Sequence, residues 1–325
     1  MAVFTTLTPL EVRKELPDFT IGELLSLEPI ASGIENTNYF LDTTEGRWVL
    51  TVFERLSESQ LPFYLELCAH LRSQGCPVAA PVRTKSGQLF SHIKGKPFSI
   101  ANRLEGRSIE NVTAKECASM GEVLARMHIA ARGFSLFQKN LRGPQWWQAT
   151  APVVLPHLDP TVGAMLSEEV NHQLTVFSDS QFQALPVAAC HCDLFRNNAM
   201  IVGHGTEQEH VSGVFDFYFA GCTALLFDVA VTVNDWCTDF EAPDLHLDPR
   251  KTEAFLRAYH AVLQFTDAER RWWPDMLRAA ALRFWLSRLY DFYQPRKASL
   301  LKPHDPTYFE RILRNRKRVT FPLVD

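Results

Sequence analysis

The feature that most constrains this chain is the string His-Cys-Asp-Leu-Phe-Arg-Asn-Asn at residues 191–198. A single aspartate follows it, at the end of an apolar run. Asp193 and Asn198 are five positions apart, and Asp216 comes 18 positions after Asn198. Transfer of a phosphoryl group from a magnesium nucleotide needs one carboxylate that accepts the hydroxyl proton. It also needs an amide oxygen and a second carboxylate that hold the metal. Because protein kinases use the same interval, the pattern predicts Asp193 as the base and Asn198 and Asp216 as metal ligands.

The alternative is that the string is accidental. A short H-x-D-x4-N match occurs by chance in many proteins, and an aspartate after a loop is usually a cap or a turn residue. Here, however, two apolar runs at 199–202 and 211–215 flank a polar tip, which is the pattern of a β-hairpin. The catalytic interpretation therefore depends on whether the surrounding architecture matches the motif.

Length and composition agree with an ordinary globular protein. A chain of 325 residues is long enough for two lobes, and 46% hydrophobic with 22% charged residues is typical of globular domains. The net charge of −4 gives no indication of a nucleic-acid partner. A basic cluster near the end is typical of a solvated helix C-terminus: Arg311, Arg314, Arg316, Lys317 and Arg318.

The chain also lacks the usual marks of export. Its start has no basic segment followed by an apolar run, and no apolar stretch reaches the roughly 18 residues of a membrane span. Seven cysteines without framework spacing indicate reduced thiols and a cytoplasmic protein with no membrane partner. Cys190 and Cys192 flank a histidine, but no second Cys/His pair at ligand spacing completes a zinc site.

The first hundred residues are predicted to be rich in β-strands. A capping box at Thr8 opens a short helix, and another helical stripe runs from Glu58 to Gln74. The expected strands cover residues 24–30, 39–42, 48–53, 89–93 and 98–104. Five strands with a helix after the third are the nucleotide lobe of a kinase. The small, polar loop at 31–38 would lay its backbone N–H groups over the phosphates, and Leu104 and Glu105 would form the hinge that meets the adenine.

The remainder is predicted to be mostly helical. Helices are expected at 113–132 and 161–185, from 248, and from 266 through Leu289. Residues 187–191 form an apolar strand that leads into the catalytic loop. The segment 134–160 is rich in proline, glycine and aromatic residues, and we expect an irregular connection there. His128 is expected to be a packed core histidine.

The chain resembles a known family. Residues 191–198 resemble the catalytic loop of the aminoglycoside-phosphotransferase-like small-molecule kinases, which share the protein-kinase-like fold. Four further segments resemble the bacterial homoserine kinase branch: residues 32–39, 48–54, 104–107 and 283–289. The resemblance is collinear from Thr8 to about Arg318.

This resemblance implies an α+β fold of the protein-kinase-like, bilobal type. A small antiparallel β-rich N-lobe would occupy residues 1–104, and a larger, mostly helical C-lobe residues 105–325. ATP and Mg²⁺ would be the cofactors, with ATP between the lobes and L-homoserine as the small-molecule acceptor, phosphorylated for threonine synthesis. The nucleotide would contact Ser32, Gly33, Asn36, Thr37, Asn38, Leu104 and Glu105. His191 and Asp228 would support the catalytic loop.

One position departs from the kinase pattern. The third strand of this fold usually carries a lysine that pairs with phosphate oxygens and a helix glutamate. Here that position is Thr51, which resembles the homoserine kinase branch and leaves Glu66 without an assigned partner. Arg55 and Lys85 are both candidates for the cation that replaces the lysine.

The acceptor stays open on sequence alone. Homoserine is a zwitterion, so its pocket should offer a cation and an anion. Arg283, Arg288 and Asp235 are the candidates, and inter-helix salt bridges are an equally good account of them. The alternatives are a kinase of the same fold that acts on choline, ethanolamine, a sugar or an aminoglycoside, and a nucleotide-binding regulator without turnover. Oligomeric state is not predicted.

Overall fold

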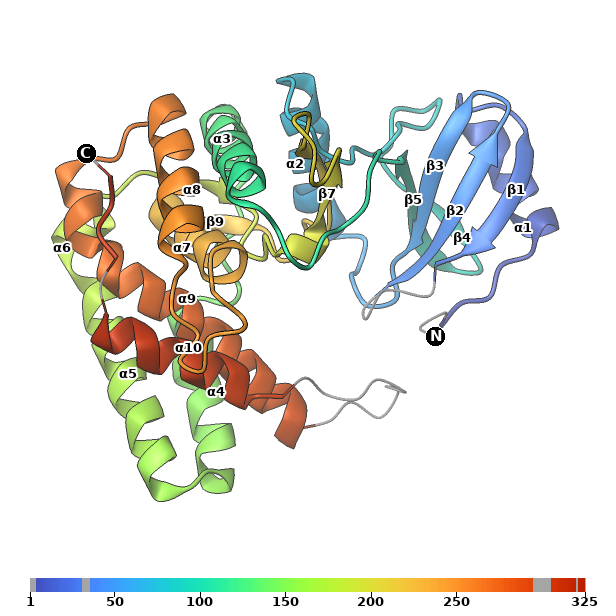
Figure 1. The fold of residues 1–325 in the computed structure, drawn as a ribbon. Coiled ribbons are helices and arrows are strands. Elements are labelled where there is room, and N and C mark those ends of the chain that lie inside the picture. Colours follow the sequence, from blue (N-terminus) through green and yellow to red (C-terminus); the bar gives the residue numbers. More distant parts are fainter. Residues whose placement is uncertain (1–3, 31–35, 295–304, 320, 325) are drawn as a thin grey trace. The chain divides into compact units, whose positions relative to one another are not determined.

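The computed structural model describes residues 4–30, 36–294, 305–319 and 321–324. The chain forms two compact units. The first comprises Met1–Glu105 with Gly213–Phe215, and the second comprises Gly106–Ser212 with Asp216–Asp325. Figure 1 shows the elements of both units.

The first unit is built on a five-stranded antiparallel sheet with the order β1-β2-β3-β5-β4. Its strands are β1 (Leu24–Pro29), β2 (Thr37–Thr43), β3 (Gly46–Val52), β4 (Ser91–Ile93) and β5 (Lys96–Asn102). Its helices are α1 (Pro9–Glu15), the 3₁₀ turn η1 (Leu16–Asp18) and α2 (Leu61–Ser73), which follows the third strand as predicted.

The strand register gives the sheet an apolar face and a face with a polar row. Tyr39 pairs with Leu50, and Leu50 pairs with Ile100, and all three are buried in the core with Val12 of α1. One position along, Asn38 pairs with Thr51 and Thr51 with Ser99. Because successive side chains point to opposite faces, these three residues form a polar row across the other face.

The second unit is mainly helical. Its helices are α3 (Ala114–Ala131), α4 (Pro144–Val154), the 3₁₀ turn η2 (Leu155–His157), α5 (Pro160–Ser178), α6 (Ser180–Gln183), the 3₁₀ turn η3 (Arg196–Asn198), α7 (Leu225–Trp236), α8 (Pro249–Val262), α9 (Asp267–Tyr293) and α10 (Thr307–Arg318). Two small sheets join β6 (Val187–Cys190) to β9 (Gly221–Ala224) and β7 (Ala199–Val202) to β8 (His210–Val214).

Helix α7 lies at the centre of this unit. Every one of its 12 residues is buried, including Asp228 and Asp235. It contacts α3, α8, α9 and both strands of the β6–β9 sheet. Its polar residues Asp228, Thr232, Asn234 and Asp235 are buried with the apolar ones, so α7 has no face toward solvent.

Two expectations about the middle of the chain are wrong. The segment 134–160, expected to be irregular, contains α4 and η2. Pro144 stands at the first position of α4, where a missing N–H costs nothing, and this favours the helix. The predicted helix 161–185 is interrupted at Asp179, whose carboxylate caps α6 by accepting the N–H groups of Gln181 and Phe182.

Among the described residues, no helix has the length and apolar character that crossing a bilayer requires.

A glycine sets the distance between α3 and α8. A Cβ on Gly121 would overlap the carbonyl oxygen of Phe255, a backbone atom that cannot move without the helix. Gly163 of α5 is a matched contrast, because its Cβ would meet the Leu155 side chain at 3.5 Å and Leu158 Cβ at 3.9 Å, both ordinary contacts.

We therefore expect Gly121→Ala to lower the free energy of unfolding by about 1–3 kcal/mol, because overpacking outweighs the gain in helix propensity. Gly163→Ala should be neutral or stabilising by up to about 1 kcal/mol. Urea unfolding followed by circular dichroism measures both values. Equal stability of the two variants would contradict the close approach of α3 and α8.

Candidate active site

The loop that carries Asp193 leaves β6 through a strained turn. Cys192 is buried and has a φ of +62°, in the left-handed region that costs a non-glycine residue free energy. Asp228 on the first turn of α7 supports this turn by accepting two backbone hydrogen bonds. His191 N–H donates to its Oδ2 at 2.9 Å and Cys192 N–H to its Oδ1 at 2.7 Å. Both donors are thereby satisfied inside the core.

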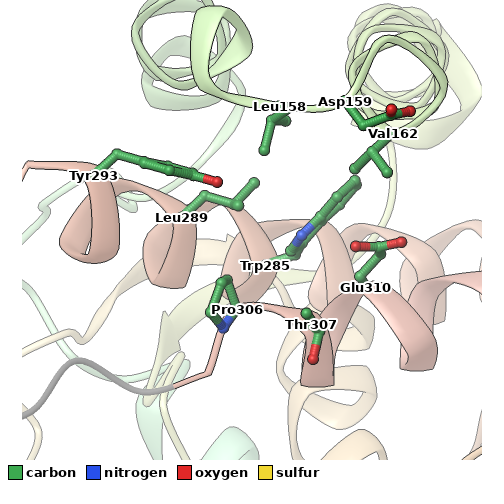
Figure 2. A pocket seen from close by; sticks show the side chains of 9 residues that line it. All are labelled: Leu158, Asp159, Val162, Trp285, Leu289, Tyr293, Pro306, Thr307 and Glu310. Carbon is green, nitrogen blue, oxygen red and sulfur yellow. The ribbon is translucent and has the colours of Figure 1, made fainter.

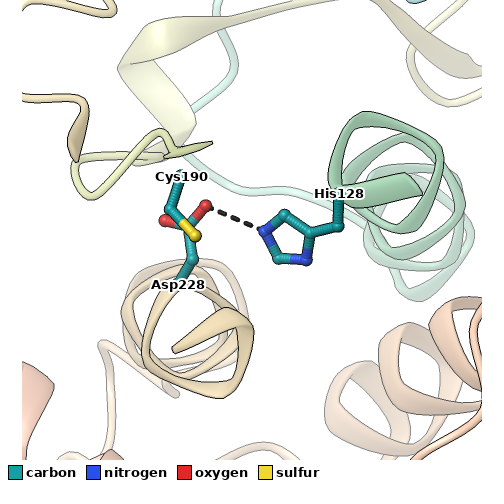
Figure 3. A group of neighbouring side chains, drawn as sticks. All are labelled: His128, Cys190 and Asp228. Carbon is teal, nitrogen blue, oxygen red and sulfur yellow. Dashed lines mark hydrogen bonds and ion pairs between the residues drawn. The ribbon is translucent and has the colours of Figure 1, made fainter. Parts of the chain in front are cut away.

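A second layer holds Asp228 itself. His128 Nε2 of α3 lies 3.1 Å from Asp228 Oδ2, and His128 Nδ1 lies 2.8 Å from the Tyr259 hydroxyl of α8. An ionised carboxylate only accepts, so Nε2 carries the proton and, in a neutral ring, Nδ1 accepts from the tyrosine. Figure 3 shows the imidazole pointing from α3 toward the carboxylate. Three helices therefore fix the base of the catalytic loop.

The Asp228 carboxylate is ionised despite complete burial. Burial acts to raise its pKa, but the His128 hydrogen bond and the nearby imidazoles outweigh burial, so the pKa lies below the ordinary value. Cys190 completes a group whose ligand atoms all lie within 4.8 Å of one another. Burial raises the pKa of the Cys190 thiol, and the backbone occupies both Asp228 oxygens, so this group braces the loop and is a poor metal site.

The other group of metal-ligand type among the described residues also joins structural elements. It comprises Glu116, His204 and Glu209. Glu116 closes the capping box of α3 and contacts His204 Nδ1 at 2.7 Å, and Glu209 accepts from Thr113 and from Gly205 N–H. These contacts attach the tip of the β7–β8 hairpin to α3.

Asp193 is oriented from two sides. An Arg283 guanidinium nitrogen lies 3.5 Å from its Oδ1. The Asn198 amide donates to its backbone carbonyl at 2.8 Å and lies 3.4 Å from its Oδ2. Its own N–H faces His191 Nδ1 at 3.3 Å, and the buried His191 ring packs against Phe217. The side chain is 17% exposed, which leaves it accessible to a small molecule.

The hairpin brings the two predicted metal ligands to one end. Asn198 directly precedes β7 and Asp216 follows β8 by two residues, and β7 and β8 pair. Asp216 is exposed and has a φ of +66°, a strained conformation of the kind found at functional sites. The Asn198 amide nitrogen is used by Asp193, so its oxygen is the atom available to a ligand.

The predicted substrate residues lie around the same loop. Asp235 Oδ1 accepts from Arg196 N–H at 2.8 Å and from Arg196 Nε at 3.0 Å. It therefore braces the end of the catalytic loop. Burial lowers the pKa of Arg283 to about 10, against the opposing effect of Asp193, and burial lowers the pKa of Arg288 in the same way. Arg283 thus keeps its charge near neutral pH.

The nucleotide residues predicted in the first unit are only partly described, because Ser32 and Gly33 lie outside the described residues. Asn36 and Thr37 are buried. The Thr37 hydroxyl accepts from the N–H groups of Phe4 and Thr5 and donates to Glu54, and Asn38 Oδ1 accepts from Thr51 at 2.8 Å. Leu104 is half-buried and Glu105 is exposed.

Thr51, at the position where kinases of this fold usually carry a lysine, thus forms a neutral hydrogen bond with Asn38. Glu66, which would have paired with that lysine, forms a surface ion pair with Arg83 at 2.8 Å. It therefore has a partner unrelated to phosphate.

Two cavities lie elsewhere in the second unit. One of about 170 Å³ is lined by α5, α9 and α10, with the Trp285 indole at its centre (Figure 2). Trp285 is two positions after Arg283 on α9, so a turn of about 200° places it on the opposite side of the helix from Asp193. A larger one of about 600 Å³ is lined by Phe137, Phe177 and Phe182, among others. Neither cavity includes Asp193, Asn198 or Asp216 among its lining residues.

The chain is similar to proteins of a known family. The model of the phosphotransferase enzyme family matches residues 26–273. The chain belongs to this family. A homoserine kinase of Cupriavidus necator is 50% identical over 320 residues, covering 97% of this chain and 96% of the relative. A homoserine kinase of Paraburkholderia phytofirmans is 49% identical over 319 residues, covering 97% and 96%.

Solved structures share the fold at low identity. An amicoumacin kinase in complex with AMP-PNP, Ca²⁺ and amicoumacin has a TM-score of 0.68 at 15% identity, covering 94% of this chain and 92% of that one. A Plasmodium vivax ethanolamine kinase has a TM-score of 0.59 at 14% identity, covering 90% and 82%. The predicted protein-kinase-like α+β fold and the resemblance to bacterial homoserine kinases are confirmed.

The central role of Asp228 can be tested by removing its charge. Asp228→Asn keeps the shape but turns one acceptor oxygen into a donor that faces a backbone N–H. We expect the free energy of unfolding to fall by about 3–5 kcal/mol, because a buried hydrogen-bonded network loses one partner. Urea denaturation measures it, with the exposed Asp267→Asn as control, expected within about 0.5 kcal/mol of wild type.

The sign of the pH dependence follows from the lowered pKa. The Asp228 contribution is complete above the ordinary carboxyl pKa and is lost as the pH falls through its lower folded-state value. Asp228→Asn should therefore show a weaker loss of stability on acidification than wild type. A variant as stable as wild type at neutral pH would refute the role of Asp228.

Proposed function

We propose that the chain is an ATP-dependent homoserine kinase, which phosphorylates the side-chain hydroxyl of L-homoserine to O-phospho-L-homoserine in threonine biosynthesis. The observation that carries this proposal is the 50% identity to a homoserine kinase across 97% of the chain. The motif residues Asp193 and Asn198 also lie together beside Arg283. The acceptor and ATP are its small-molecule partners, and we place the enzyme in the cytoplasm.

Asp193 is the group we propose as the base. Arg283 holds one of its carboxylate oxygens and the Asn198 amide approaches the other, so the carboxylate presents a fixed direction to an incoming hydroxyl. It accepts the hydroxyl proton as the oxygen attacks the γ-phosphorus, and the bond from phosphorus to the leaving ADP oxygen breaks. Positioning of the hydroxyl supplies much of the acceleration, because two reactants are brought into one geometry.

Asn198 and Asp216 suit Mg²⁺, since an amide oxygen and a carboxylate are the hard oxygen ligands that this ion prefers. Bound there, Mg²⁺ would neutralise charge on the phosphate oxygens. The backbone of residues 36–38 and of Leu104 and Glu105 would contact the nucleotide. Asp228 and His191 act only by positioning the loop that carries Asp193.

The experiment is a coupled assay of ADP release with homoserine, choline, ethanolamine, a sugar and kanamycin as acceptors. We expect homoserine to give the highest kcat/KM. Homoserine at background level with turnover of another acceptor would reassign the enzyme to that substrate, and no turnover of any acceptor would favour a regulator.

In the same assay, Asp193→Asn should lower kcat on homoserine by about 10²- to 10⁴-fold, the usual contribution of a general base. Binding of ATP, measured by calorimetry, should be retained because the Asn198 and Asp216 ligands are untouched. The control Asp267→Asn should match wild type in both measurements. A near wild-type kcat for Asp193→Asn would exclude the base assignment.

A further inference from the structure

Arg283 is a buried cation with a hydrogen-bonding group left over. Its side chain is 5% exposed, and its guanidinium stacks on the Phe284 ring at 3.7 Å. Its Nε is buried without a hydrogen-bond partner. Its contact with Asp193, at 3.5 Å, is longer than the roughly 2.8 Å of a strong charge-assisted hydrogen bond. Burial of a charged donor that is incompletely bonded is costly, which indicates a ligand.

A second guanidinium, that of Arg142, packs on the Trp146 ring at 4.8 Å and also reaches an aromatic ring that Arg283 contacts. Arg142 belongs to the segment just before α4 and lies 5.9 Å from the centroid of the Phe219 ring. Arg283 lies 5.2 Å from the same centroid. Phe219 is three positions after Asp216, so the ring to which both arginines pack is tied to the predicted metal ligand.

Three arginines of this group act on one another electrostatically. Burial is the main cause of the lowered pKa of Arg283, and Asp193 opposes it, but Arg142 and Arg288 lower this pKa further. Arg142 is therefore close enough to repel Arg283. Of the other carboxylates near these arginines, Asp235 is bonded to Arg196, and Asp291 acts on Arg288. Arg142 and Arg283 are the two guanidinium groups that pack on Phe219, and a pair of cations near a reacting group favours an anionic ligand.

We propose that the guanidinium groups of Arg142 and Arg283, packed around Phe219, bind the carboxylate of the acceptor and so select hydroxy acids over neutral or cationic alcohols. This inference rests on the proposed kinase function and names its specificity site. The four bonds from the hydroxyl oxygen of homoserine to its carboxyl carbon span roughly 5 Å. A hydroxyl at Asp193 thus places the carboxylate within reach of Arg283, which already touches Asp193. Guanidinium forks match a carboxylate in shape as well as in charge.

The same arginines could instead face the phosphates of ATP. That alternative makes a different prediction, because loss of a phosphate contact raises the KM for ATP, whereas loss of a carboxylate contact raises the KM for the acceptor. A purely structural arginine would affect every substrate equally. The test therefore compares two acceptors that differ only in the carboxylate.

The variant is Arg142→Gln, and the acceptors are L-homoserine and 3-aminopropan-1-ol, which is homoserine without its carboxylate. On homoserine we expect kcat/KM to fall by about 10- to 100-fold, mainly through KM, because one charge-assisted hydrogen bond is lost. The KM for ATP should stay within about twofold of wild type. On 3-aminopropan-1-ol, kcat/KM of the variant should match that of wild type within about threefold. If turnover of 3-aminopropan-1-ol is too slow to measure, its inhibition constant in competition with homoserine should match within about threefold.

Two further variants keep the test decisive. Arg142→Lys keeps the positive charge without the two parallel N–H donors of a guanidinium, and it should recover part of the kcat/KM that Arg142→Gln loses on homoserine. Arg126→Gln removes an exposed arginine that pairs with Glu122 on α3 and should change nothing. The inference is overturned by an equal loss on both acceptors, by a raised KM for ATP, or by an unchanged KM for homoserine. A wild-type enzyme with no turnover of homoserine would instead overturn the proposed function.

Discussion

The site depends first on the contact between the Asp228 carboxylate and the backbone of residues 191 and 192. The turn at Cys192 adopts a left-handed conformation that a cysteine does not favour, and two short hydrogen bonds to a buried carboxylate hold it there. His128 and Tyr259 extend this network into α3 and α8. Three helices therefore fix the backbone conformation of the turn at residues 191 and 192. Asp193 is the next residue, and its position is a consequence of this turn.

The remaining charges are distributed around that turn. Asp235 fixes Arg196 at the far end of the loop, and Arg283 approaches Asp193 from α9. In the first unit, the position that carries a lysine in related kinases is Thr51, which bonds to Asn38. In the second unit, the cation that contacts Asp193 is Arg283. This arrangement fits an acceptor that brings its own negative charge.

Sequence predicted what is local and failed where distant segments meet. The capping box at Thr8, the expected helix at 113–132 and the β-hairpin after Asn198 depend on short-range signals, and the corresponding elements are present. Helix α7 buries its polar residues as well as its apolar ones and has no exposed face, and Arg142 lies in a stretch that looks irregular. Arg316 was expected in solvent but is 3% exposed, because it bonds to Asn234, Thr238 and the Leu245 carbonyl. Such partners are 71 to 82 positions away, beyond any local pattern.

The central claim is that Asn198 and Asp216 hold one divalent ion beside Asp193. Electron paramagnetic resonance of Mn²⁺ with the protein and AMP-PNP measures this directly, since free and bound Mn²⁺ differ in signal. Asp216→Asn should weaken Mn²⁺ binding by at least about tenfold, because loss of a residue that only contacts a metal ligand already weakens binding by about that much. Asp193→Asn should bind Mn²⁺ with the affinity of wild type. Wild-type affinity for Mn²⁺ in Asp216→Asn would contradict the account.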